Sequence, residues 1–176
     1  MTDINTIAPI LRSFIIEQSG VNAQFVRDAT TEYGAYLDQH ISQGVFETIT
    51  PSNTMILFEL KTRESTTNMS YTNKDNSISY FNSYRLHIII YGNDSGNVAN
   101  KLVARFRTEK VRNSILASGI YMESISEPFR ITEFKNSIVW QRNDIDVDIS
   151  CEISITQTST DPDYASFDKI NIIQRS

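Results

Sequence analysis

Residues 84–121 read YRLHIIIYGNDSGNVANKLVARFRTEKVRNSILASGIY, and this stretch decides the fold. Near its start Leu86, Ile88 and Ile90 recur at every second position, and this period of two in a run rich in β-branched side chains predicts a half-buried strand. The turn GNDSG follows, in which glycine and asparagine tolerate left-handed dihedral angles and aspartate can cap a helix. We therefore expect a strand, a turn, a helical segment and the start of a second strand, in this order.

The helical segment carries two apolar patterns rather than one. The first pattern forms one stripe at Val98, Ala99, Leu102, Val103 and Phe106. At about 100° per residue its continuation falls on polar residues, while the apolar residues of the segment 111–116 are out of phase with it. We therefore predict a break near Arg107 and Thr108, with Thr108 as the cap of a second short helix and Gly119 as its C-cap. The alternative is one continuous helix with two buried faces.

The length and charge of the chain limit the class of protein. With 176 residues the chain is expected to form one domain with a substantial core. The net charge of −5 argues against a general nucleic-acid binder, which usually carries a basic face. Four basic residues lie close together at Arg105, Arg107, Lys110 and Arg112. A solvated helix face is the favoured interpretation of this group, and a local basic patch is the alternative.

The single cysteine and the hydropathy pattern bear on the compartment. Cys151 has no second cysteine for an intrachain disulfide and occupies an apolar strand position, so we expect a buried, inert thiol. No apolar run approaches the roughly 20 residues of a membrane span. The first residues lack the basic region and apolar core of a signal peptide. We therefore expect a protein of a cytosol-like compartment without a membrane partner.

The flanking segments supply a helix and further strands. The sequence predicts a helix over residues 6–18, strands over residues 33–42, 45–49, 55–62, 78–81 and 121–125, and a short extended piece around Phe25 and Val26. In the first helix Thr6 is expected to be the cap, and Pro9 is tolerable only within the first turn. Residues 130–140 are expected to form an irregular or extended link. Trp140 is interpreted as a core anchor, with an interface anchor as the alternative.

Two polar segments are expected to lie outside the core. Residues 63–77 are almost wholly polar and predict a long exposed hairpin loop, which is either disordered or a contact arm. The candidate contact residues of this loop are Arg63, Met69, Tyr71 and Lys74. Residues 157–176 form a polar C-terminal tail, which can dock on the body of the domain or on a neighbour.

The cleanest alternation in the chain runs from Asp144 to Thr156. Its apolar face consists of Ile145, Val147, Ile149, Cys151, Ile153 and Ile155, and acidic and hydroxyl residues occupy the other face. The pattern predicts a long strand with a core face and a solvated face, as in an antiparallel sheet covered on one side. With strands on both sides of the helical segment, we predict a single α+β domain over residues 1–176. A mixed, mostly antiparallel sheet would pack against the N-terminal helix and the broken central helical segment.

Candidate catalytic and metal-binding residues are few. Asp144, Asp146 and Asp148 form the one carboxylate cluster, but side chains two apart on a strand are roughly 7 Å apart, whereas hard cations need ligands at about 2.0–2.6 Å. The row is interpreted as a solvated sheet face, or as a negative surface beside a passage for DNA. His40 and His87 have no matching partners in the sequence and are expected to be structural. Since nucleophile and phosphate-loop motifs are missing, we expect no catalytic, cofactor or metal site.

Residues 83–155 resemble the phage tail terminators, a class of proteins in the virion neck. The shared features are an apolar strand over residues 86–92, a helix with Ala99, Leu102 and Val103, a helical turn that ends in residues 116–120, and a long alternating strand that ends in residues 146–150. An amphipathic N-terminal helix, here with Leu11, Phe14 and Ile15, also fits the opening of this family.

The resemblance implies a small structural subunit, not an enzyme, that forms a ring, usually a hexamer, at the head-proximal end of the tail. Such rings stop the growth of the tail tube and offer a docking face to head-completion proteins. In contractile tails they also hold the last sheath ring. The implied partners are therefore further copies of this chain, the tail tube protein, neck proteins and, in a contractile tail, the sheath protein. DNA only passes through, and assembly into the virion takes place in the cytoplasm of the bacterial host.

On this interpretation residues 63–77 can reach a neighbour or the tube, and the row from Asp144 to Asp148 suits a ring lumen. Two other functions stay open. One is another neck, head-completion or tail-tube protein, which would polymerise or bind the head rather than cap the tail. The other is a small cytosolic enzyme, which would need a deep pocket that unites His87 with the aspartate row.

Overall fold

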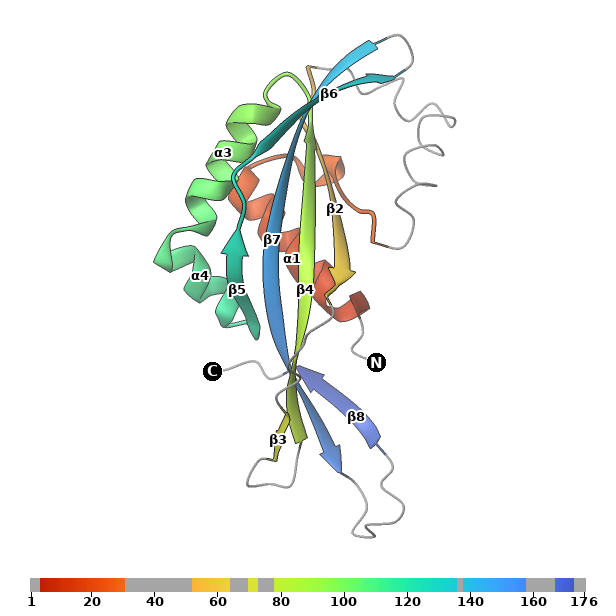
Figure 1. Cartoon of the computed structure of the whole chain (residues 1–176), viewed down its shortest axis with the longest axis vertical. Helices are drawn as coiled ribbons and strands as arrows, with labels where there is room; N and C mark the ends of the chain where they lie inside the picture. The colour runs from red at the N-terminus through yellow and green to blue at the C-terminus, as the bar shows by residue number, and fades with distance from the viewer. Residues whose placement is uncertain are drawn as a thin grey trace.

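The computed structural model describes residues 4–30, 52–63, 70–72, 78–135, 138–157 and 167–172. They form two layers, in which α-helices cover one face of a mixed β-sheet (Figure 1). The helices are α1 (Ile4–Ser19), α3 (Ser95–Phe106) and α4 (Glu109–Leu116), and the 3-10 turn η1 spans Ala23–Phe25. The strands are β1 (Val26–Asp28), β2 (Met55–Thr62), β3 (Ser70–Thr72), β4 (Ile78–Tyr91), β5 (Ile120–Ile125), β6 (Phe129–Lys135), β7 (Ile138–Gln157) and β8 (Phe167–Ile172). This arrangement confirms the predicted α+β fold.

The sheet is built around its two longest strands, β4 and β7. All 14 residues of β4 pair antiparallel with β7, from Ile78 opposite Ile155 to Tyr91 opposite Arg142. The other edge of β4 pairs with β2 and β3, and the other edge of β7 pairs with β6, β5 and β8 in succession. Among the described strands, β1 alone pairs in parallel, with β2. The sheet is therefore mixed and mostly antiparallel, as the sequence predicts.

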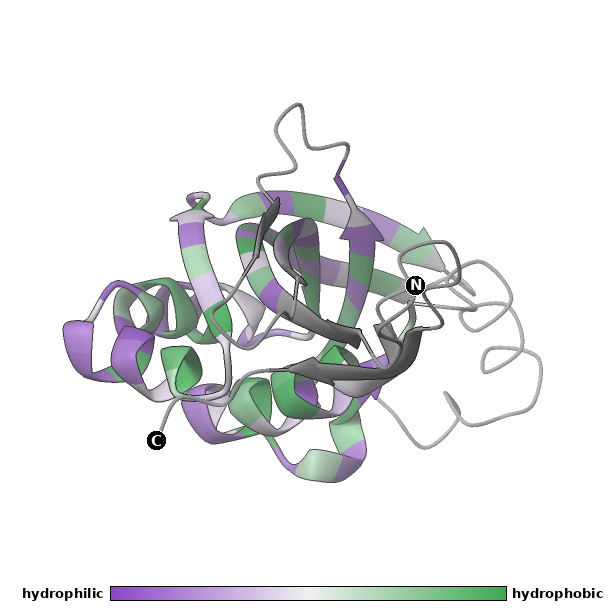
Figure 2. Ribbon diagram, turned by 90° about the horizontal axis from the view of Figure 1, so that it is seen from below, coloured by the Kyte–Doolittle hydropathy of each residue, from purple (hydrophilic) through white to green (hydrophobic). Residues whose placement is uncertain are grey.

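The core lies between the sheet and the helices. Hydrophobic and hydrophilic residues alternate along the strands, and the helices lie against one side of the sheet (Figure 2). The sheet residues of this core include Phe58 of β2, Tyr84, Leu86, Ile88 and Ile90 of β4, and Ile145, Val147 and Ile149 of β7, all buried in one cluster with residues of α1 and α3. Phe106 of α3 stacks on Phe14 of α1 with ring centroids 5.2 Å apart. The predicted core faces of both long strands are thus confirmed for these residues.

The central helical segment is broken where its apolar stripe ends. α3 ends at Phe106 and α4 begins at Glu109, so the predicted break is confirmed and the single continuous helix is excluded. Thr108 is the N-cap of α4 with extended backbone at φ −75° and ψ 140°, and its hydroxyl donates to a backbone carbonyl of α3 at 2.7 Å. The predicted C-cap is wrong, because Ala117 holds that position and Gly119, at φ +76°, closes the turn that follows.

α1 begins earlier than its sequence signals indicate. The helix starts at Ile4, so Thr6 and Pro9 both lie inside it and the prediction that Thr6 is the cap is wrong. A proline inside a helix removes one hydrogen bond and crowds the preceding turn. The apolar face of α1 includes Ile7 and Leu11, which are fully buried. Packing of this face against the sheet therefore outweighs the local preference.

The basic residues of α3 and α4 join neighbouring segments of the fold. Lys101 and Arg105 donate to the last two carbonyls of α1, at 2.9 and 2.7 Å, where cations meet the negative end of the helix dipole. Arg112 donates to a carbonyl of β5 at 2.7 Å, and Arg107 pairs with Glu127. All four residues of the group predicted as a solvated helix face are exposed. Three of them, Arg105, Arg112 and Arg107, also hold α1, β5 and the turn after β5 in place, respectively.

The predicted strands are confirmed where apolar residues alternate along the segment, and strands were missed where the conformation depends on pairing with a distant strand. The strands over residues 55–62, 78–81 and 121–125 are confirmed as parts of β2, β4 and β5. The short extended piece is confirmed at Val26 in β1 but wrong at Phe25, which ends the 3-10 turn η1.

The link over residues 130–140 is extended, one of its two predicted forms, since β6 pairs there with the start of β7 as a hairpin. In contrast, β3 lies within the predicted loop 63–77 and β8 in the tail, where no strand was predicted. β3 holds no apolar alternation and β8 only the pair Ile170 and Ile172, so pairing with β4 or β7 sets their conformation. The predicted strands over residues 33–42 and 45–49, and His40, lie outside the described residues.

Gly92 ends β4 in a conformation that favours glycine, with φ +117°. A Cβ atom at this position would lie 2.2 Å from the carbonyl oxygen of Asn53. We expect Gly92→Ala to lower the free energy of unfolding by about 1–3 kcal/mol, because the turn must distort to relieve the clash. Gly96→Ala in α3 is the matched control, since its Cβ would lie 3.8 Å from the Asn143 amide nitrogen and alanine favours a helix. Denaturant titrations that show the same effect for both variants would contradict this explanation.

Candidate functional site

The sheet face opposite the helices carries a row of charged side chains. The register places Arg85 of β4 opposite Asp148 of β7, and His87 opposite Asp146. Residues opposite one another in antiparallel strands share a face, so the predicted acidic row meets a row of cations. We refer to the residues Arg85, His87, Arg142, Asp144, Asp146 and Asp148 as the charge ladder.

His87 lies between two carboxylates of the charge ladder. Its Nδ1 is 2.6 Å from Asp146 Oδ1, and its Nε2 is 3.5 Å from Asp144 Oδ2. A hydrogen bond with Asp144 raises the pKa of His87 above 6.5; burial opposes this rise and Asp146 reinforces it. Glu59 of β2 lies opposite His87 across the neighbouring strand pair and itself pairs with Lys61 at 2.8 Å. These contacts favour the imidazolium form of His87.

The raised pKa of His87 makes the stability of the fold depend on pH. A histidine with a higher pKa in the folded chain contributes its stability in full below the unfolded pKa and loses it as the pH rises through the folded pKa. We therefore expect the free energy of unfolding of the wild type to fall, relative to that of His87→Gln, as the pH rises from below 6.5 through the raised pKa of the folded state. Denaturant titrations of both proteins across this range measure the difference. A constant difference would mean that His87 does not titrate as an ion-paired group.

Arg142 is the most enclosed cation of the charge ladder, with 13% of its side chain exposed against 44% for Arg85. Its Nε donates to Asp144 Oδ1 at 2.6 Å, and its Nη1 donates to the carboxylate of Glu133. Its guanidinium also lies 5.8 Å from the centre of the Tyr91 ring. Burial alone would lower the pKa of Arg142, but its bonds with Asp144 and Glu133 raise it. The side chain is therefore a charged group held between two carboxylates and an aromatic ring.

Asp148 occupies the opposite end of the charge ladder. Its Oδ1 accepts from Arg85 at 3.0 Å, and its Oδ2 lies 3.1 Å from Arg63 and accepts from Ser124 at 2.9 Å. Burial would raise the pKa of Asp148, but the hydrogen bonds from Arg85 and Ser124 lower it. Arg63, a predicted contact residue of the exposed loop, is therefore engaged within its own chain.

The acidic row is less solvated than the sequence predicts. The Asp144 side chain is 11% exposed, whereas 44% of the Asp146 side chain is exposed. Burial would raise the pKa of Asp144, but hydrogen bonds from His87 and Arg142 lower it. The prediction of a wet face is therefore wrong at Asp144, because these two cations enclose it. The placement of the row in a ring lumen stays a prediction.

Of the other predicted contact residues, Tyr71, Met69 and Lys74, the structure describes one. Tyr71 lies in β3, where its backbone pairs opposite Ser79 of β4. Met69 and Lys74 lie outside the described residues. The prediction that residues 63–77 form a contact arm therefore remains a prediction.

Three further features of the described residues concern metal binding, the cysteine thiol and membrane spans. Within these ranges no group of three or more His, Cys, Asp or Glu residues could hold a metal ion. Cys151 is a buried free thiol, as predicted, and burial raises its pKa to about 12. No helix in the described part of the chain is both long and apolar enough to cross a membrane.

A second apolar cluster supports the base of the β6–β7 hairpin. It comprises Met55, Leu57, Ile89, Tyr91 and Trp140, with Phe25 packed against it. Tyr91 and Trp140 meet edge to face with ring centroids 6.4 Å apart. Trp140 is 5% exposed, which confirms the prediction that it is a core residue. Sequence reasoning missed the cluster as a whole, although the apolar Met55, Leu57 and Ile89 on the supposedly wet faces of β2 and β4 were a signal for it.

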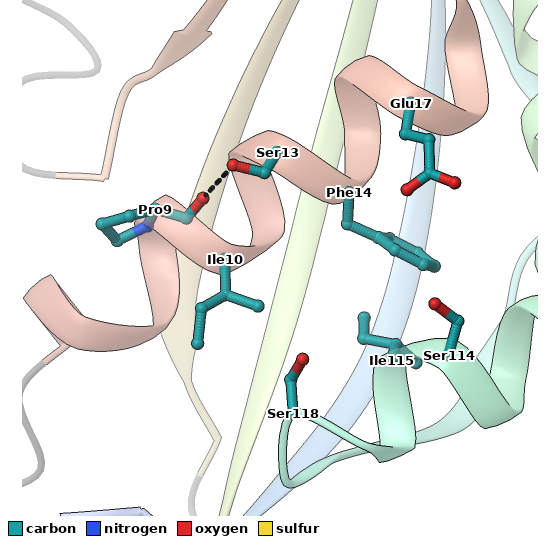
Figure 3. Close-up of a pocket in the computed structure, with 8 residues that line it drawn as sticks. All are labelled: Pro9, Ile10, Ser13, Phe14, Glu17, Ser114, Ile115 and Ser118. Atoms are coloured by element: carbon teal, nitrogen blue, oxygen red, sulfur yellow. Dashed lines mark hydrogen bonds between the residues drawn. The ribbon is translucent and has the colours of Figure 1, made fainter. Parts of the chain in front are cut away.

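Two uncovered surfaces complete the candidate site. Phe129, Phe134 and Val139 of the β6–β7 hairpin are 67%, 73% and 52% exposed. A cavity of about 430 Å³ lies between α1 and α4 (Figure 3). Sequence reasoning missed both surfaces, because an apolar residue on a strand or helix is expected to face the core. These surfaces, and not a cluster of reactive groups, distinguish the described part of the chain.

Sequence comparison assigns the chain to the structural proteins of phage tails and necks. A family model described as phage neck terminator protein matches residues 23–174. This match spans most of the chain, and the protein belongs to the phage neck terminator family. No curated protein matches the chain. The resemblance to the tail terminators is thereby confirmed, and with it the role of a virion component of the neck or tail.

Proposed function

We propose that this chain forms a homohexameric ring that caps the head-proximal end of the phage tail tube. The ring ends tail polymerisation and provides the surface on which the head docks. The observation that carries this proposal is the match of the neck terminator family to residues 23–174. The exposed Phe134 and Val139 support it, because they lie opposite each other in the register and adjoining exposed apolar side chains can mark a contact with another protein.

The proposed partners follow from this position in the virion. The ring contacts the tail tube protein on one side and the head-completion proteins of the neck on the other. It also holds the last sheath ring if the tail is contractile. The subunit assembles in the cytoplasm of the bacterial host, and residues 63–77 reach the tube or a neighbouring subunit. This role needs no cofactor and no metal ion.

The charge ladder suits a surface past which DNA moves. Phosphate groups bind proteins chiefly through lysine and arginine side chains. Each cation of the ladder already pairs with a carboxylate, as Arg85 does with Asp148 and Arg142 with Asp144. We therefore propose that the face with Asp144, Asp146 and Asp148 borders the lumen of the ring, and that DNA passes it without being held.

Negative-stain electron microscopy of the purified chain, alone and with tail tubes, tests the proposal. We expect rings, or added density at one end of each tube, and shorter tubes when the chain is present during tube polymerisation. Chains that stay monomeric and leave tube length unchanged would contradict capping. Polymerisation of the chain itself would identify a tail-tube protein instead, and binding to heads but not to tubes would identify a head-completion protein.

The alternative of a small enzyme gains little support from the site. Its one favourable feature is the closeness of His87 to Asp144 and Asp146. Asp144 is also bound by Arg142, and the cavity between α1 and α4 is lined by no residue of the charge ladder. The structural role is therefore the function that we propose.

A further inference from the structure

The β6–β7 hairpin continues past the end of the central strand pair. The last pair of β7 with β4 is Arg142 opposite Tyr91, and residues 138–141 of β7 pair with β6 beyond it (Figure 1). Phe134 and Val139 of this part are exposed, so they bury little surface against the sheet. Trp140 packs in the second apolar cluster. The polar contacts around Arg142, at the base of the hairpin, supply the rest of its attachment.

A continuous chain of polar contacts runs from the base of the hairpin to His87. On β6 the carboxylate of Glu133 accepts from Tyr91 Oη at 3.1 Å and from Arg142 Nη1. Arg142 also binds both oxygens of Asp144, with its Nε and Nη2 at 2.6 and 2.5 Å. Asp144 Oδ2 lies 3.5 Å from His87 Nε2. These side chains are largely enclosed, so water compensates poorly for a contact that is lost.

His87 lies among charged side chains whose cations are already engaged. The register gathers around it Glu59 and Lys61 of β2, Arg85 of β4, and Asp144, Asp146 and Asp148 of β7. Lys61 is bound to Glu59 at 2.8 Å, and Arg85 to Asp148 at 3.0 Å. The direct partners of the imidazole are therefore Asp144 and Asp146. The hydrogen bond with Asp144 raises the pKa of His87 above 6.5, so the imidazolium form is lost as the pH rises through this higher pKa.

The proton of His87 decides the sign of its contact with Asp144. An imidazolium donates from both nitrogens, whereas a neutral imidazole donates from one nitrogen and presents a lone pair at the other. Nδ1 makes the shorter contact, 2.6 Å from Asp146 Oδ1, so the remaining proton stays on this nitrogen. Nε2 then presents its lone pair to the carboxylate of Asp144, whose side chain is 11% exposed. Loss of the proton therefore converts an attraction into a repulsion.

We propose that the protonation state of His87 controls how firmly the β6–β7 hairpin is held to the sheet. The imidazolium and Arg142 hold Asp144 from two sides, and Arg142 in turn holds Glu133 at the base of the hairpin. When the imidazole is neutral, Asp144 shifts away from it, and the bonds that join Arg142, Glu133 and Tyr91 weaken. The hairpin then opens more often, while the pairing of β4 with β7 stays intact. His87 is thus a positioning residue that acts through Asp144 and Arg142.

This control of the hairpin goes beyond the capping function, because it operates within a single subunit. Native-state hydrogen exchange tests it, read as protection factors, which remove the direct effect of pH on the exchange rate. We expect the protection of the β6 amides to fall by about tenfold as the pH rises through the pKa of His87, since a hydrogen bond to a charged group contributes at least about this factor. The amides of α4, which has no residue in the charge ladder, are the internal reference and should keep their protection.

Two variants assign the effect to His87. In His87→Gln the protection of the β6 amides should be the same at both ends of this pH range. His40→Gln removes the other histidine of the chain and is the matched control, which should keep the pH dependence of the wild type. If His87→Gln does not fold, the wild type alone decides. The midpoint of the change in β6 must then coincide with the titration midpoint of the His87 ring, followed by its NMR signal.

The outcomes separate control by His87 from a general effect of pH on the fold. A fall in the protection of β6 that follows the titration of His87, with α4 unchanged, would support the inference. Constant protection of β6, an equal fall in β6 and α4, or a midpoint different from that of His87 would overturn it. Any of these three results would leave the capping function standing, and a chain that leaves tail tubes uncapped would leave the control by His87 standing.

Discussion

Replacing Phe106 by alanine is expected to lower the free energy of unfolding by about 3–5 kcal/mol. Phe106 is 1% exposed, and its ring stacks on Phe14 with centroids 5.2 Å apart. Its removal leaves a cavity at the end of α3, where α3 and α1 meet above the sheet. For a chain of 176 residues this loss corresponds to a fall of roughly 10 °C in Tm. Denaturant titration and calorimetry measure both quantities.

Phe129→Ala provides the matched comparison for Phe106→Ala. Phe129 is 67% exposed, so its truncation should change the free energy of unfolding by no more than about 0.5 kcal/mol. The contrast between two phenylalanine residues of the same chain isolates burial from residue type. Similar losses for both variants would show that the contact between Phe106 and Phe14 does not hold the helical layer together.

Arg142→Met is expected to cost about 3–5 kcal/mol, because it removes the enclosed cation that Asp144 and Glu133 share. The exposed fractions of the three side chains are 13% for Arg142, 11% for Asp144 and 20% for Glu133. A carboxylate in such an enclosed site keeps its desolvation penalty when a cation is removed, and the contacts that remain, such as that of Asp144 with His87, offset this penalty only in part. Denaturant titration at neutral pH measures the loss.

A triple variant separates unpaired charge from lost packing at Arg142. Arg142→Met combined with Asp144→Asn and Glu133→Gln removes all three charges and keeps the side chains close to their original size. We expect the triple variant to recover most of the loss, since replacement of a whole buried ionic group is often nearly neutral. If it is no more stable than Arg142→Met, the guanidinium contributes mainly through its contact with the Tyr91 ring.

Much of the fold was predictable, because its main signals are local. The alternation from Asp144 onward marks most of β7, and the phase change after Phe106 marks the break between α3 and α4. The start of α1 and the strands β3 and β8 were not predictable in this way. β3 and β8 depend on a register with β4 and β7 that no short window of sequence contains.

The sequence predicts which residues of the charge ladder share a face of one strand, but not which residues pair between the two strands. The sequence places Asp146 and Asp148 on one face of their strand, and Arg85 and His87 on one face of another. Only the antiparallel register brings these two faces together, and only then does the acidic row become a set of ion pairs. The exposed side chains of the β6–β7 hairpin and the cavity between α1 and α4 could not be predicted from the sequence. Their exposure depends on where the tertiary fold stops covering apolar side chains.

The pairing of β4 with β7 along its whole length also affects how the subunit bears force. Hydrogen bonds between antiparallel strands lie perpendicular to the strands. All 14 residues of β4 pair with β7, so tension that pulls these strands past each other strains this entire ladder at once. A peeling force applied at one end would instead open the bonds in turn. The strand pair therefore gives the subunit a stiff axis, and its resistance to stretching depends on the direction of the pull.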